Sequence, residues 1–96
     1  MRGFNEFLGF ARKAVADYWN GHINKPGGPE LTPEEVYIAW YSKELQNQKA
    51  TLSADVAVKE GLYFELTWNG DKDEAYLDVY KKLDNVVVKA EEAEGM

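Results

Sequence analysis

The stretch Leu62-Tyr63-Phe64-Glu65-Leu66-Thr67-Trp68, followed directly by Asn69-Gly70, decides the fold. Its large apolar residues alternate with tyrosine, glutamate and threonine, and this period of two predicts a half-buried strand. Asn-Gly is a strong signal for a short β-hairpin. The next segment, from Ala75 to Lys81, alternates Ala75, Leu77 and Val79 with Tyr76, Asp78 and Tyr80. The two segments therefore predict an antiparallel hairpin.

Upstream, Lys49 to Ala54 alternates in the same way and predicts another strand. Thr32-Pro33-Glu34-Glu35 carries a capping box with proline at the first helical position, which predicts a helical turn. The β-branched and aromatic residues from Val36 to Tyr41 favour a strand after that turn. A full helix from Thr32 to about Gln48 is the competing interpretation, and Val86 to Val88 is a short fifth candidate strand.

From Phe4 to Trp19 the apolar residues recur in steps of three and four, which predicts an amphipathic helix that ends near Gly21. The fold class is therefore α+β, with one N-terminal amphipathic helix packed on an antiparallel β-meander of about four strands. Residues 1–90 form a single domain, and residues 91–96 are expected to be a flexible acidic tail. The following residues are expected to form the core: Phe7, Leu8, Ala11, Val15, Leu52, Leu62, Phe64, Leu66, Leu77 and Val79.

The composition of the chain excludes several classes of protein. The chain has 96 residues, a formal net charge of −6, and no cysteine, so it is expected to lack disulfides and thiolate metal sites and to reside in a reducing compartment. No apolar run reaches the roughly 20 residues that span a bilayer, so no membrane partner is expected. The negative charge makes long nucleic acids poor partners.

Residues for catalysis are scarce. His22 is the single histidine, and its position at the end of the predicted helix favours a structural role. The acidic run from Asp71 to Glu74 lacks the spacing of a calcium-binding loop and is expected to be a solvated hairpin tip. The sequence therefore predicts neither a catalytic site nor a metal or cofactor.

The density of aromatic residues is the most informative feature for function. Tyr63, Tyr76 and Tyr80 share one predicted sheet face with Glu65 and Asp78. Tyrosines on the wet side of a sheet are either cross-strand pairs or anchors for a partner. Four lysines lie nearby in the sequence and are candidate contacts to a nucleotide: Lys43, Lys49, Lys81 and Lys82.

A set of motifs from Trp40 to Lys82 resembles a known family. These motifs are Trp40-Tyr41-Ser42-Lys43-Glu44-Leu45-Gln46-Asn47-Gln48-Lys49-Ala50, Gly61-Leu62-Tyr63-Phe64-Glu65, Asn69-Gly70-Asp71-Lys72, Tyr76-Leu77-Asp78 and Tyr80-Lys81-Lys82. They resemble small proteins carried by phages and prophages of Gram-positive bacteria, domain of unknown function 6275. The resemblance implies a short phage accessory protein in the bacterial host cytoplasm, and it brings no catalytic residues.

Two functions from different classes remain. The first is a non-enzymatic protein that binds and modulates or inhibits a host protein, which has a basic surface that an acidic domain can block. The second is a protein that binds or sequesters a small nucleotide on its aromatic sheet face. An exposed patch without a cavity favours the first. A concave site of about 300 Å³ or more, in one chain or at the subunit interface of a homo-oligomer, favours the second.

Overall fold

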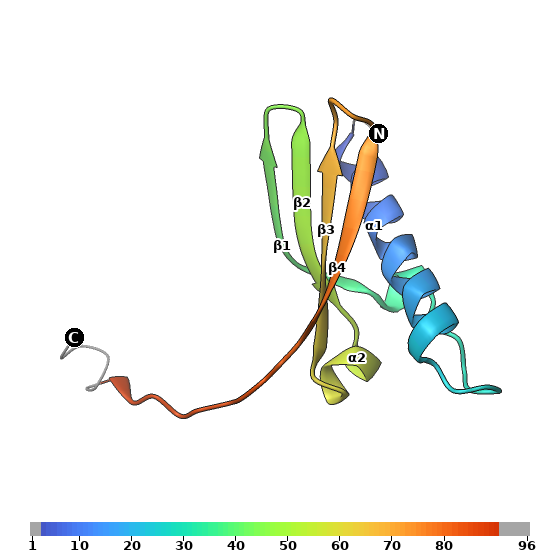
Figure 1. The fold of residues 1–96 in the computed structure, drawn as a ribbon, viewed down its shortest axis with the longest axis vertical. Coiled ribbons are helices and arrows are strands. Elements are labelled where there is room, and N and C mark those ends of the chain that lie inside the picture. Colours follow the sequence, from blue (N-terminus) through green and yellow to red (C-terminus); the bar gives the residue numbers. More distant parts are fainter. Residues whose placement is uncertain (1–2, 91–96) are drawn as a thin grey trace.

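The computed structural model describes residues 3–90, and the predicted tail at residues 91–96 lies outside this range. A four-stranded antiparallel sheet in the order β1-β2-β3-β4 carries one long helix on one of its faces (Figure 1). The elements that matter below are α1 (Phe4–Tyr18), β1 (Tyr37–Glu44), β2 (Asn47–Ser53), α2 (Asp55–Lys59), β3 (Leu62–Asn69) and β4 (Glu74–Lys81). This arrangement confirms the predicted α+β class with a helix on a β-meander.

The helix α1 lies diagonally across the sheet. Its buried stripe includes Phe7, Ala11 and Val15, which are fully shielded from solvent. Near its N-terminal end, Phe7 contacts Tyr41 of β1, and near its C-terminal end Tyr18 contacts Phe64 of β3. The chain continues past Tyr18 as one π-helical turn, Trp19–Ile23, so the helical segment passes Gly21 by two residues.

The segment before β1 resolves the two interpretations of residues 32–48. Pro33–Glu35 forms a single 3-10 turn, and the Glu35 carboxylate accepts hydrogen bonds from the Thr32 backbone N–H (2.9 Å) and hydroxyl (3.0 Å). The bond from the Thr32 backbone lowers the pKa of Glu35, with a smaller contribution from the Thr32 hydroxyl. After this turn the chain is extended as β1. The prediction of a turn followed by a strand is confirmed, and the long-helix alternative is wrong.

Strand pairing follows the predicted alternation in β2 and β3. Leu52 lies opposite Phe64 and Ala50 opposite Leu66, and these four side chains form the centre of the core beneath α1. At the β3–β4 turn, the Asn69 side chain accepts hydrogen bonds from the backbone of Asp71 and Lys72 (3.1 and 3.2 Å). Gly70 donates its N–H to the Gln46 carbonyl (3.1 Å) in the neighbouring turn, where a side chain on Gly70 would clash with Gln46.

Two sequence expectations need correction, and one element was not anticipated. Val79 was expected in the core, but 38% of its surface is exposed and Leu77 is only half-buried, because α1 packs mainly over β2 and leaves β4 at the edge. Val86 to Val88 do not form a strand, since nothing within residues 3–90 pairs with them. The short helix α2 was not anticipated between β2 and β3.

Within residues 3–90, no helix is both long and apolar enough to cross a membrane.

Candidate functional site

Within residues 3–90, no long helix covers the face of the sheet opposite α1, here called the open face (Figure 1). Along β3 the side chains of Tyr63, Glu65 and Thr67 point to this face, while Phe64, Leu66 and Trp68 are buried against α1. The register places Tyr80 opposite Tyr63, Asp78 opposite Glu65, and Tyr76 opposite Thr67. All five residues of the predicted tyrosine face, Tyr63, Glu65, Tyr76, Asp78 and Tyr80, therefore lie together on the open face.

Two contacts order the tyrosines. The rings of Tyr63 and Tyr80 stack with centroids 5.0 Å apart and planes inclined by 14°. The hydroxyl of Tyr76 donates a hydrogen bond to the carboxylate of Glu74 on the same strand. These contacts hold the Tyr63 and Tyr80 rings and the Tyr76 hydroxyl in place while the three rings remain exposed to solvent.

Carboxylates raise the pKa of two of these phenols. The negative charge of Glu65 is the largest cause of the raised pKa of Tyr80, followed by partial desolvation and the charge of Asp78. For Tyr76, the hydrogen bond to Glu74 is the main cause of the raised pKa. Both phenols are therefore neutral at physiological pH, and the O–H group of Tyr76 is donated to Glu74.

The open face also contains two aromatic residues that the sequence reasoning did not place there. The register shifts between Ile38 and Trp40, so that Trp40 lies opposite Thr51 on the open face while Ile38 and Tyr41 face α1. Trp40 is 53% exposed and Tyr37 is 43% exposed. A simple alternation groups Trp40 with Ile38, because a β-bulge at Ala39 leaves no clear mark in the sequence. The sequence offered only the aromatic character of these residues as a signal. That character does not tell on which face of an edge strand a side chain lies.

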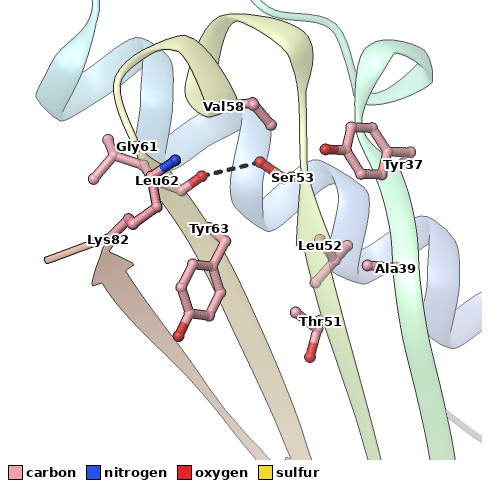
Figure 2. Close-up of a pocket in the computed structure, with 10 residues that line it drawn as sticks. All are labelled: Tyr37, Ala39, Thr51, Leu52, Ser53, Val58, Gly61, Leu62, Tyr63 and Lys82. Atoms are coloured by element: carbon pink, nitrogen blue, oxygen red, sulfur yellow. Dashed lines mark hydrogen bonds between the residues drawn. The ribbon is translucent and has the colours of Figure 1, made fainter. Parts of the chain in front are cut away.

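A hollow of about 310 Å³ opens at the α2 end of this face (Figure 2). Its walls are mostly apolar: Tyr37 of β1 stands on one side and Leu62 and Tyr63 of β3 on the other, with Val58 of α2 between them at the top of the view. The Ser53 hydroxyl lines it but donates its hydrogen bond to the Leu62 carbonyl (3.0 Å). Lys82 supplies a cation at the rim. This hollow suits one apolar or aromatic group, with an anionic group near Lys82.

A second hollow of about 470 Å³ lies at the opposite end, beside the β1–β2 turn. Trp40, Glu44, Lys49 and Thr67 are among its lining residues, so it is more polar than the first. The ammonium group of Lys49 is 3.6 Å from the Glu65 carboxylate. The open face therefore has a hollow at each end, the first lined by Tyr63 and the second by Trp40.

The four predicted lysines are divided between the two faces. Lys49 and Lys82 belong to the open face. Lys43 pairs with Gln48, and Lys81 pairs with Leu62, so both share the alternation of residues on the α1 side. The open face therefore combines four carboxylates, Glu44, Glu65, Glu74 and Asp78, with two ammonium groups, Lys49 and Lys82.

The other candidates lie away from the open face. His22 is exposed at the end of the helical segment and stacks on Tyr18, with ring centroids 4.5 Å apart. Asp71 and Asp73 lie in the exposed turn between β3 and β4. Among residues 3–90, no group of three or more histidine, aspartate or glutamate side chains is placed to hold a metal ion.

The arrangement described above is a two-layer α+β domain with one unshielded aromatic sheet face. Residues 8–90 match the model of a family of unknown function, DUF6275, and the chain belongs to that family. No curated protein and no solved structure gives a significant match.

Proposed function

We propose that this chain is a small, non-enzymatic accessory protein of phages that acts in the cytoplasm of the bacterial host, where it binds a host protein through the open face and modulates or inhibits it. The phage context is supported by the motifs between Trp40 and Lys82. The binding role is supported by one observation above all. Five exposed aromatic side chains share the open face: Tyr37, Trp40, Tyr63, Tyr76 and Tyr80.

Exposed tyrosine and tryptophan are the residues that carry most of the binding energy in protein interfaces. On the open face they alternate with Glu65, Glu74 and Asp78, which favours a partner with arginine and lysine side chains. Arginine fits best, because its guanidinium stacks on aromatic rings and pairs with carboxylates at once. The apolar hollow beside Tyr63 then accommodates one aliphatic or aromatic side chain of the partner.

The test compares capture of host proteins by three full-length forms: wild type, Tyr76→Ala/Tyr80→Ala, and His22→Ala as a matched aromatic control away from the open face. A specific partner is one that wild type and His22→Ala retain and the tyrosine variant loses. With that partner purified, each tyrosine substitution is expected to weaken binding by more than about 1 kcal/mol, measured by calorimetry. Higher salt should weaken it further, because exposed ion pairs are screened over about 8 Å at physiological ionic strength.

A partner bound equally well by the tyrosine variant would contradict the use of the open face. Loss of binding in a folded His22→Ala variant would also contradict the proposal, because the binding surface would then include the end of the helical segment.

One observation favours a second candidate, the binding of a small nucleotide. The hollow beside Tyr63 has the volume of a small ligand site, and Lys82 stands at its rim. A base stacked on a tyrosine gains about 1 to 3 kcal/mol. Denaturation of purified protein followed by mass spectrometry would release and identify such a ligand. Binding of that nucleotide should be lost in Lys82→Ala and survive in Asp78→Asn, whereas a basic protein partner should respond in the opposite way.

A further inference from the structure

The segment after β4, residues 83–88, is here called the C-terminal arm. It runs extended away from the sheet and pairs with nothing in the described part of the chain (Figure 1). Leu83 is 99% exposed and Val87 85%, and Val86 and Val88 are also largely exposed. Three consecutive valines favour a strand. A contiguous group of exposed apolar side chains marks a contact site on a soluble domain.

The same chain offers a surface that such an arm fits. β4 is an edge strand: one side pairs with β3, and the backbone N–H and C=O groups on its other side are unpaired. On the α1 side of β4, Val79 is exposed and Leu77 is only half-buried. The edge of the domain at β4 therefore combines unpaired backbone with uncovered apolar side chains.

We propose that two copies of this chain exchange C-terminal arms, each arm adding as an antiparallel strand to the free edge of β4 in the other copy. Such addition pairs the backbone N–H and C=O groups of the arm and places valine side chains beside Leu77 and Val79. This inference does not depend on the proposed function, because it uses the β4 edge and leaves the tyrosines of the open face uncovered.

The geometry at the root of the arm favours a second copy over any other occupant. Lys82 donates its backbone N–H to the Gly61 carbonyl (2.7 Å), so the arm leaves the sheet in continuation of β4. In a dimer with a twofold axis beside the end of β4, the arm of each copy therefore lies next to β4 of the other copy. The same interaction then forms twice. The arm and the free edge of β4 belong to the same chain. Exchange between two copies therefore pairs the backbone of both, and no different partner is needed.

The test measures the mass of full-length protein by light scattering during size-exclusion chromatography over a range of concentrations. Wild type is expected to reach a mass near twice the 10.9 kDa of the chain. The variant Val86→Ser/Val87→Ser should keep the circular dichroism of the folded domain and shift the monomer–dimer equilibrium toward monomer by at least about tenfold. The control is Leu45→Ser, which removes an exposed apolar side chain from the β1–β2 turn, at the end of the sheet opposite to the root of the arm, and should remain dimeric.

Hydrogen exchange supplies the second readout. The amides of Val86 to Val88 should exchange slowly in the wild-type dimer and rapidly in the serine variant. A wild type that stays monomeric would overturn the proposal, whether its arm exchanges rapidly, as a free arm, or slowly, as an arm folded back on its own domain. A dimer that survives in the serine variant would overturn it as well, because the interface would then lie elsewhere.

Discussion

The two faces of the sheet belong to the same strands, yet the side chains on each face have different roles. In β3, Phe64 and Leu66 are buried under α1, whereas Tyr63 and Glu65 stand in solvent on the open face. Stability should therefore depend on one face and recognition on the other. This division explains how a short domain tolerates so many exposed aromatic rings, because removing one leaves no cavity in the core.

The largest expected effect concerns the buried face. Phe64→Ala removes a fully buried ring beneath α1 and should destabilise the domain by about 3 to 5 kcal/mol. The exposed neighbour Tyr63 provides the matched control on the same strand, and Tyr63→Ala should cost far less. Urea unfolding followed by tryptophan fluorescence measures both. Similar losses for the two variants would show that the faces do not differ in the way described.

A second prediction concerns the polar pair on the buried face. The Tyr41 hydroxyl donates a hydrogen bond to the side-chain carbonyl of Gln48 (2.6 Å), and Gln48 is buried. Tyr41→Phe leaves that oxygen without its donor and should cost about 1 to 3 kcal/mol. The double variant Tyr41→Phe/Gln48→Leu removes both polar groups and should recover most of the loss. If the double variant is no more stable than the single one in urea unfolding, the hydrogen bond is not what stabilises this pair.

Much of this division was predictable from periodicity. The alternation in β3 and in β4 correctly separated Phe64 and Leu66 from Tyr63 and Tyr80, because a strand with one buried face imposes a period of two on its sequence. The buried stripe of Phe7, Ala11 and Val15 was also predictable, because a helix with one buried face imposes a period of 3.6 residues on its sequence. The exposure of Val79 was not predictable, since the position of α1 over β2 depends on tertiary packing and not on the local pattern in β4.

The candidate site was only partly predictable. The tyrosines were placed correctly on one face, but Trp40 was grouped with Ile38 because the bulge at Ala39 breaks the alternation. The hollow beside Tyr63 depends on Val58, which reaches it from a helix of one and a half turns that carries no long-range sequence pattern. Lys43 and Lys81 were selected by nearness in sequence, and strand alternation then places both on the α1 side.

A third prediction sharpens the description of the open face. The stacked rings of Tyr63 and Tyr80 should be coupled by about 0.5 to 1.5 kcal/mol in a double-mutant cycle with alanine. Tyr63 and Tyr76 lie opposite different residues, so a second cycle on that pair should give additive losses. Thermal or urea unfolding of the single and double variants gives both coupling energies. Equal coupling in the two cycles would indicate a general change of the sheet and not a ring contact.

The smallest expected effect is on the ionisation of the open face. The charge of Glu65 is the largest cause of the raised pKa of Tyr80, and the hydrogen bond to Glu74 is the largest cause for Tyr76. A raised pKa means that the folded state favours the neutral phenol. The resulting stabilisation is complete below the ordinary tyrosine pKa of about 10 and is lost as the pH rises through the higher folded values. Stability should therefore decline in this alkaline range.

Titration of each tyrosine by NMR, through the chemical shift of its ring carbon next to the hydroxyl, separates the two causes. Glu65→Gln should lower the pKa of Tyr80 and leave that of Tyr76 unchanged, whereas Glu74→Gln should do the reverse. Each variant is thus the control for the other. The raised pKa of Tyr80 rests mainly on the charge of Glu65, whereas that of Tyr76 rests on a hydrogen bond. Added salt screens charges in solvent and should therefore reduce the pKa shift of Tyr80 more than that of Tyr76. A Tyr80 that ionises at the ordinary value in wild type would show that solvent screens it from the charge of Glu65.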